Sequence, residues 1–156
     1  MKETTYDRGN ISESLLLSAY LRAGFFVSIP FGSGAPYDLI GDTGKRALRI
    51  QVKTGWYRKG CILFRCMRRV REASPYKARV YSQDEVDYFA VYYPPNDSIY
   101  VVPRTVCGAG TGCLRIEPVL NGQQKLIRWA RDYTWEKHIA ELQSESASAN
   151  CRKRSS

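Results

Sequence analysis

The chain has 156 residues, which predicts one domain, and its polar start at residues 1–5 and lack of a long apolar run predict neither a signal peptide nor a membrane span. Its 24 basic and 15 acidic residues give a net charge of +9, which favours a polyanionic partner. The five cysteines are odd in number and lack C-x-x-C spacing, and there is one histidine. This pattern favours reduced, structural thiols in an intracellular protein over a zinc site or a disulfide framework.

The N-terminal part predicts a helix followed by a strand. Asn10 can cap a helix over residues 10–23, and Glu13, three residues later, can reach back to complete a capping box. Gly24 is a typical residue for ending that helix. The apolar, β-prone residues 25–31 predict a strand, which a Gly- and Pro-containing loop follows.

Residues 36–55 predict a β-hairpin with two chemically different faces. Its strands are joined by a turn sequence at residues 42–45. Side chains alternate between the two faces of a strand. One face of the second strand is therefore apolar (Leu48, Ile50, Val52) and the other polar (Arg49, Gln51, Lys53). The polar face brings a lysine and an amide close to Asp38 on the neighbouring strand.

The rest of the chain predicts more strands and a last helix. We expect a strand at residues 60–66, an exposed β-extension or loop at 67–81 and a β-hairpin at 87–102. A glycine-rich loop with a short strand after it follows at 106–116, and a helix at 123–142. The Ser-rich residues 143–156 predict a disordered basic tail behind a domain of residues 1–142. The order predicts an α/β or α+β fold, a mixed sheet with helices packed on it.

Basic residues are concentrated between residues 58 and 79, where Glu72 is the one acid. Such clustering is an electrostatic footprint for phosphates. A two-stranded ribbon fits the major groove of DNA, where arginine reads guanine edges. We therefore expect a basic β-extension that contacts DNA through Arg58, Lys59, Arg65, Arg68, Arg69, Arg71, Lys77 and Arg79.

The residues of the hairpin suit phosphodiester hydrolysis. Magnesium prefers oxygen ligands, and Asp38, the Gln51 side chain and the Val52 backbone carbonyl supply them. Lys53 supplies a cation that offsets charge developing on the phosphate. Glu13 could add a carboxylate if its helix packs on the sheet, although it could instead be only half of the capping box.

At these residues the chain resembles the PD-(D/E)XK nuclease superfamily, whose hallmark is an acid on one strand, acid-x-lysine on the next and a glutamate on the preceding helix. More narrowly, it resembles the small bacterial homing endonucleases of this fold that group I introns encode. The matching segments are residues 29–32, 35–40, 49–55, 86–92, 98–103 and 121–125. The resemblance covers roughly residues 5 to 140.

The resemblance implies a restriction-endonuclease-like core with a mixed central sheet flanked by helices. It implies a Mg²⁺-dependent enzyme, with Mn²⁺ able to substitute, that makes a double-strand break at a pseudopalindromic intron insertion site. The implied catalytic residues are Glu13, Asp38, Gln51 and Lys53. Cutting both strands needs at least a dimer, and the resemblance implies a homotetramer. We expect a cytoplasmic, nucleoid-associated bacterial protein with no membrane partner and no small-molecule cofactor.

Two alternatives stay open: a Holliday-junction resolvase or restriction-like nuclease of the same superfamily, and a catalytically silent DNA-binding protein. Gln51 stands where the superfamily usually has an acid, so the site carries less negative charge for a cation. Four further polar residues are expected to be structural: Asp42 in a turn, Glu85 and Asp87 flanking a strand, and His138 at a surface or interface.

Overall fold

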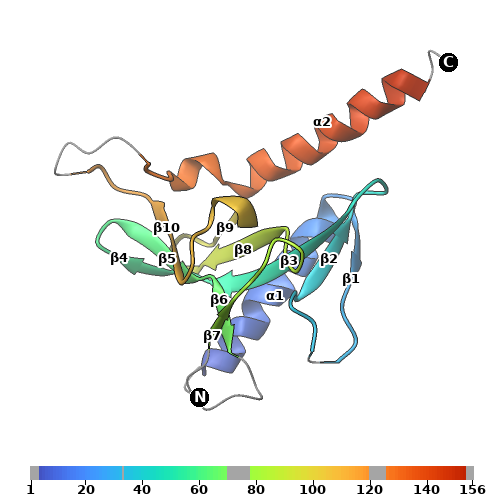
Figure 1. Cartoon of the computed structure of the whole chain (residues 1–156). Helices are drawn as coiled ribbons and strands as arrows, with labels where there is room; N and C mark the ends of the chain where they lie inside the picture. The colour runs from blue at the N-terminus through green and yellow to red at the C-terminus, as the bar shows by residue number, and fades with distance from the viewer. Residues whose placement is uncertain (1–3, 33, 70–77, 120–125, 154–156) are drawn as a thin grey trace.

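The computed structural model describes residues 4–32, 34–69, 78–119 and 126–153 (Figure 1). Its elements, in chain order, are α1 (Thr5–Arg22), β1 (Phe26–Ser28), β2 (Leu39–Asp42), β3 (Ala47–Thr54), β4 (Trp56–Arg58), β5 (Cys61–Arg65), β6 (Met67–Arg69), β7 (Ala78–Val80), β8 (Tyr88–Tyr93), β9 (Ser98–Pro103), β10 (Thr111–Arg115) and α2 (Trp135–Lys153). Short 3₁₀ turns follow β8 and β9 and precede α2. The predicted α/β class with a mixed sheet is confirmed.

The first helix begins earlier than Asn10, so the prediction of its start is wrong. The side chain of Thr4 accepts a hydrogen bond from the backbone N of Asp7 at 3.2 Å, and the Asp7 carboxylate accepts one from the Thr4 backbone N at 2.8 Å. This reciprocal capping box starts the helix at Thr5. Glu13 therefore lies in the middle of α1, where no capping role is left for it.

The central sheet contains the predicted hairpin. Its strand order is β1-β2-β3-β8-β9, with β3 and β8 parallel and every other neighbouring pair antiparallel. β2 and β3 pair in register from Leu39 opposite Ile50 to Asp42 opposite Ala47. Asp42 accepts a hydrogen bond from the Gly44 backbone N at 2.8 Å, which confirms it as a turn residue. The predicted hairpin of residues 87–102 corresponds to β8 and β9.

The two faces of this sheet pack against different layers. On one face, the predicted apolar residues of β3 join side chains of both helices in a buried cluster, which contains Leu16, Tyr20, Leu39, Leu48, Ile50, Val52, Ala90 and Leu142. On the other face, β8 and β9 pack against the separate sheet β10-β5-β4. Gly55 allows the close approach, because a Cβ there would lie 2.7 Å from Ile62. The polar face of β3 therefore ends at the junction between the two sheets.

The basic region forms two separate hairpins rather than one extension. β4 pairs with β5, and β6 pairs with β7 as a two-stranded ribbon. Figure 1 shows the ribbon of β6 and β7 and the hairpin of β4 and β5 at different places on the domain. The expected β-extension is thus confirmed for β6 and β7, while residues 70–77 lie outside the described part of the chain.

The last helix also differs from its prediction. The described chain between residues 126 and 134 contains a short 3₁₀ turn and makes two isolated bridges to strands, from Trp129 to Arg115 and from Thr134 to Tyr100. The Arg115 backbone N donates to the Arg128 carbonyl at 2.7 Å, and the Val101 N donates to the Tyr133 carbonyl at 2.8 Å. These strand contacts use backbone groups that a helix would need, so α2 begins only at Trp135. The segment 121–125 lies outside the described residues.

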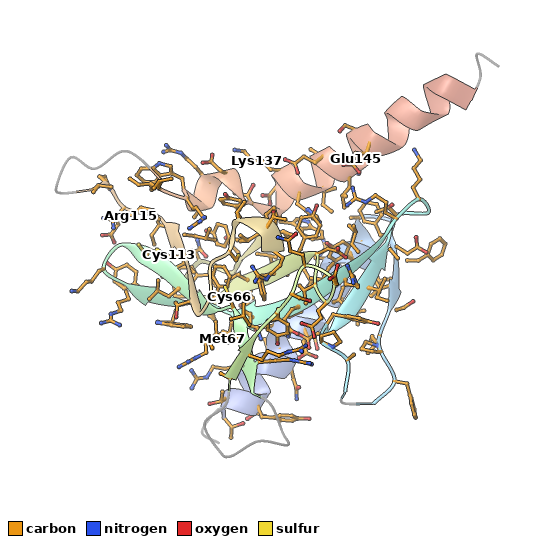
Figure 2. All side chains as sticks on the ribbon, in the orientation of Figure 1. Cys66, Met67, Cys113, Arg115, Lys137 and Glu145 are labelled. Atoms are coloured by element: carbon orange, nitrogen blue, oxygen red, sulfur yellow. The ribbon has the colours of Figure 1, made fainter. Side chains whose placement is uncertain are left out.

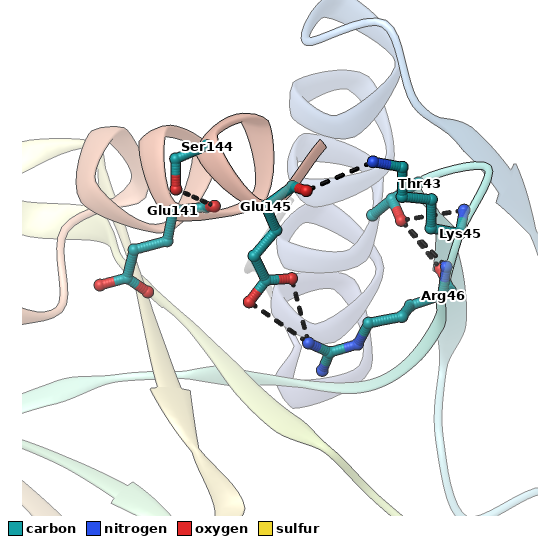
Figure 3. Close-up of polar contacts among 6 residues, drawn as sticks. All are labelled: Thr43, Lys45, Arg46, Glu141, Ser144 and Glu145. Atoms are coloured by element: carbon teal, nitrogen blue, oxygen red, sulfur yellow. Dashed lines mark hydrogen bonds and ion pairs between the residues drawn. The ribbon is translucent and has the colours of Figure 1, made fainter. Parts of the chain in front are cut away.

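The α2 helix extends past Leu142, where it was expected to end. In Figure 3, the carboxylate of Glu145 pairs with Arg46 at 3.1 Å, and its backbone carbonyl accepts a hydrogen bond from Lys45 at 3.3 Å. These exposed contacts tie the helix to the β2–β3 turn. The division of the chain into a domain of residues 1–142 and a tail of 143–156 stays a prediction.

His138 is buried, which corrects its expected place at a surface or interface. Its Nε2 lies 2.7 Å from the hydroxyl of Tyr20, and its ring contacts those of Tyr88 and Trp135. Burial among these groups lowers the pKa of His138 to about 4. The neutral ring is therefore part of the packing between α1 and α2.

This buried histidine predicts that acid weakens the fold. Because the folded pKa lies below the ordinary 6.5, protonation favours the unfolded chain, so the stabilisation is present above about pH 6.5 and is lost as pH falls toward about 4. Relative to a His138→Gln variant, the free energy of unfolding should fall by about 3 kcal/mol over that range. Urea unfolding at several pH values measures this. Parallel pH profiles of the two proteins would contradict it, since no other histidine occurs in the sequence.

Candidate active site

Asp38 is placed at the centre of the site by the backbone of β3. Its own backbone N donates to the carbonyl of Ile50 at 2.9 Å, which extends the hairpin ladder one residue before β2. Its carboxylate accepts a hydrogen bond from the Val52 backbone N at 2.7 Å and a second one from the Gln51 side-chain amide. Two donors from β3 thus fix one carboxylate oxygen.

The Gln51 amide joins this carboxylate to a backbone carbonyl. Its Nε2 donates to Asp38 and also lies 3.3 Å from the carbonyl oxygen of Val52. A carboxylate oxygen, a peptide carbonyl and a side-chain amide therefore converge on one point. Rotation of the Gln51 amide by 180° would exchange its nitrogen for its oxygen at this point. Residues 38, 51 and 52 would then supply three oxygen donors.

Lys53 extends the same polar face of β3. Its ammonium donates to the hydroxyl of Tyr81 at 3.3 Å and lies 5.1 Å from the centre of that ring. Burial lowers the pKa of Lys53, while the negative groups Asp38 and Glu13 oppose that shift. The structure thus brings Lys53 and Asp38 into one electrostatic cluster, as the alternation of the strand predicts.

Glu13 reaches the same cluster from α1. The neighbouring Ser12 is buried, and its hydroxyl contacts the hydroxyl of Thr54 at 2.7 Å, which fixes this turn of α1 against the end of β3. A half-open cavity of about 200 Å³ lies beside the helix; its lining residues are Asn10, Glu13, Ser14, Leu17, Ile29, Asp38 and Leu39. Both carboxylates therefore face one space that a phosphate group could enter.

The two carboxylates are poised to receive a cation. Burial raises the pKa of Asp38, with the Val52 N–H, Lys53 and the Gln51 amide opposing that shift. Burial followed by repulsion from Asp38 raises the pKa of Glu13. A divalent cation between such groups relieves their repulsion and favours their ionised forms.

The donor set fits Mg²⁺, which prefers one or two carboxylates, carbonyl oxygens and water. Asp38, Gln51 and the Val52 carbonyl would hold the ion, with Glu13 as a further carboxylate. Within the described residues, no three or more His, Cys, Asp or Glu side chains form a group that could hold a metal ion.

The predicted DNA-binding residues fall into three groups. Arg58, Lys59 and Arg65 are exposed on the β4–β5 hairpin. Arg68 and Arg79 lie on the ribbon, and both form ion pairs with Glu85. Nothing is described for the side chains of Arg69, Arg71 and Lys77.

Three residues that support the site were missed in the sequence. Ser12 and Thr54 join α1 to β3, and Tyr81 contacts Lys53. Ser12 could have been found from its helical spacing to Leu16 and Tyr20, which places it on the buried face of α1. Nothing in the nearby sequence marks Tyr81, because its partner Lys53 is 28 residues away. Asp87, expected only to flank a strand, pairs with Arg49 at 3.0 Å.

Comparisons of the whole chain with known proteins identify its family. The bacterial homing endonuclease I-Ssp6803I has a similar structure, with a TM-score of 0.72 and 23% sequence identity over 93% of this chain and 97% of that one. A Holliday junction resolvase of Archaeoglobus fulgidus, Hjc, matches more weakly, with a TM-score of 0.44 and 17% identity over 69% of this chain and 84% of that one. No curated protein matches the sequence. The profile of the PD-(D/E)XK endonuclease matches residues 3–136. The chain therefore belongs to the PD-(D/E)XK endonuclease family.

Proposed function

We propose that this protein is a site-specific homing endonuclease that makes a double-strand break in DNA by Mg²⁺-dependent phosphodiester hydrolysis. The observation that carries the proposal is the convergence of the Asp38 carboxylate, the Gln51 amide and the Val52 carbonyl, together with Lys53 on the same strand, whose ammonium interacts electrostatically with Asp38. Oxygen donors and a nearby cation of this kind suit metal-assisted hydrolysis of a phosphodiester.

The chain's own residues have separate tasks in this proposal. When bound, Mg²⁺ polarises the scissile phosphate and lowers the pKa of water. Asp38, Gln51 and the Val52 carbonyl would hold it, and Glu13, which lines the same cavity as Asp38, would add negative charge. Lys53 places its ammonium where negative charge grows on the phosphate oxygens as the new P–O bond to water forms and the bond to the leaving sugar oxygen breaks.

The exposed arginines on two hairpins suit a long DNA site. Arg58, Lys59 and Arg65 on β4–β5 and the ribbon of β6 and β7 project from different places on the domain. Phosphate contacts would give salt-dependent affinity, and arginine contacts to base edges would give sequence choice. One domain reads few base pairs, so we propose a homotetramer with two subunits on each half of a pseudopalindromic intron insertion site.

No helix in the described residues has the length and apolar character to span a membrane. We propose that the protein acts on the bacterial nucleoid, with Mg²⁺ as its cofactor and Mn²⁺ able to replace it.

A cleavage selection tests this function. The protein is incubated with Mg²⁺ and a library of randomised linear duplexes, and cleaved molecules are sequenced; a four-way junction serves as the competing substrate. We expect one pseudopalindromic sequence to be enriched, and no cleavage in EDTA. Cleavage of the junction alone would show a resolvase, and DNA binding without cleavage of any substrate would show a silent DNA-binding protein.

A further inference from the structure

Tyr81 is a buried tyrosine whose hydroxyl contacts the proposed catalytic lysine. It follows directly after β7, and its side chain is 4% exposed. Its hydroxyl accepts a hydrogen bond from the Lys53 ammonium, and its ring lies under the same group. Tyr81 therefore contacts Lys53 in two ways, through an oxygen lone pair and through the aromatic face.

The ring of Tyr81 is held firmly by the core. It meets the ring of Phe89 edge-on, with 5.6 Å between centres and 73° between planes. Phe89 is the residue of β8 that pairs with Gln51. The Tyr81 carbonyl accepts a hydrogen bond from Arg104 at 2.6 Å, and Arg104 also donates to the Cys107 carbonyl at 2.7 Å. Both ends of this residue are thus fixed to the central sheet.

The turn after Tyr81 is also bound to the β6–β7 ribbon through Glu85. The Glu85 carboxylate accepts a hydrogen bond from the Ser82 backbone N at 2.9 Å, which fixes it close to Tyr81 in the chain. The same carboxylate pairs with Arg68 of β6 at 3.3 Å and with Arg79 of β7. Both strands of the ribbon are therefore tied to the turn that begins at Tyr81.

We propose that Tyr81 is the positioning residue of Lys53, and that it links the place of the ammonium in the active site to the base of the β6–β7 ribbon. The proposal rests on the nuclease function proposed above. A lysine has a long side chain with about 2 kcal/mol of rotamer entropy, so a fixed acceptor is needed to hold its ammonium in one place. The phenol suits this task because its oxygen accepts a hydrogen bond, and burial raises its pKa to about 12, so it stays neutral beside the ammonium.

The variant Tyr81→Phe removes the acceptor and keeps the ring. A matched control is Tyr100→Phe, because Tyr100 belongs to the same buried cluster and its hydroxyl accepts a hydrogen bond from Asn96, not from Lys53. On the duplex recovered from the cleavage selection, Tyr81→Phe should lower the single-turnover rate by about tenfold. Its dissociation constant for that duplex and the rate of Tyr100→Phe should stay within about twofold of the unmodified protein.

A second measurement needs no cleavage. The Lys53 ammonium lies 5.1 Å from the centre of the Tyr81 ring. In ¹H–¹³C spectra of the free protein, the signal of the methylene next to that ammonium should therefore be displaced from those of the exposed lysines. In Tyr81→Phe this signal should move toward those of the exposed lysines, and in Tyr100→Phe it should not.

An unchanged Lys53 signal, or an unchanged rate in Tyr81→Phe, overturns the positioning role. Equal losses in both variants, or a parallel loss of DNA affinity, overturn it as well. If the unmodified protein cleaves no duplex, the nuclease function fails, and the Lys53 signal alone then decides whether Tyr81 holds the ammonium.

Discussion

Replacing Lys53 with alanine should abolish DNA cleavage and leave DNA binding largely intact. The ammonium interacts electrostatically with Asp38, which belongs to the converging oxygen donors, and in the proposed mechanism it meets negative charge that develops only in the transition state. Removal of such a group costs about 10² to 10³-fold in rate, or more, without a matching loss in ground-state binding. Single-turnover cleavage with Mg²⁺ measures the first effect, and the dissociation constant of the same duplex in EDTA measures the second.

A matched control removes one positive charge far from the site. Lys137 is exposed on α2 and pairs only weakly with Asp132 at 3.4 Å (Figure 2). Lys137→Ala changes the net charge as much as Lys53→Ala does, so any general electrostatic loss of DNA affinity appears in both variants. Should Lys53→Ala lose binding and cleavage to the same degree, Lys53 anchors a phosphate in the ground state and the proposed mechanism is wrong.

The hairpin and its polar face could be predicted because both depend on local pattern. The strict alternation of β3 places Leu48, Ile50 and Val52 in the core, and the turn at Asp42 and Gly44 sets the register. Register in turn brings Asp38 next to Gln51 and Val52. The sequence therefore predicts that these side chains meet, and their role as an active site stays a proposal.

The helix boundaries could not be predicted in the same way, because competing contacts decide them. Asn10 and Thr4 are both acceptable caps, and the Thr4–Asp7 box is formed while Asn10 lies inside the helix. The apolar spacing after residue 126 suggests a helix, but Arg128 and Tyr133 pair with strands β10 and β9. Such long-range pairing overrides local propensity.

Contacts between distant segments account for the residues that were missed. Tyr81 reaches Lys53, 28 residues away, because it packs against Phe89 of β8, and β8 pairs in parallel with β3. No local spacing encodes such a meeting. The same holds for His138, which is buried by contact with Tyr20, 118 residues away.

Replacing Gln51 with glutamate should keep cleavage and change its dependence on Mg²⁺. The amide now donates to Asp38, whereas a carboxylate in its place repels it and adds negative charge to the site. Without Mg²⁺, the variant should therefore unfold at a lower temperature than the unmodified protein, and Mg²⁺ should restore more of its stability. With Mg²⁺, the concentration for half-maximal cleavage should fall by about tenfold, because an added ligand charge tightens cation binding. Melting curves and cleavage rates over a Mg²⁺ titration measure both effects.

Two further substitutions serve as controls for Gln51→Glu. Gln51→Ala removes the oxygen and the donor together and should lower cleavage by about 10 to 100-fold while affecting DNA binding less. Gln83→Glu makes the same change of charge at an exposed position and should leave the Mg²⁺ dependence unchanged. If Gln51→Glu is as inactive as Gln51→Ala at every Mg²⁺ concentration, the site requires the amide as a hydrogen-bond donor to Asp38, and Gln51 is not an oxygen ligand of the metal. Full activity in Gln51→Glu with a lowered Mg²⁺ requirement means that the position needs only an oxygen, so the amide is a weaker version of the acid found elsewhere in the superfamily.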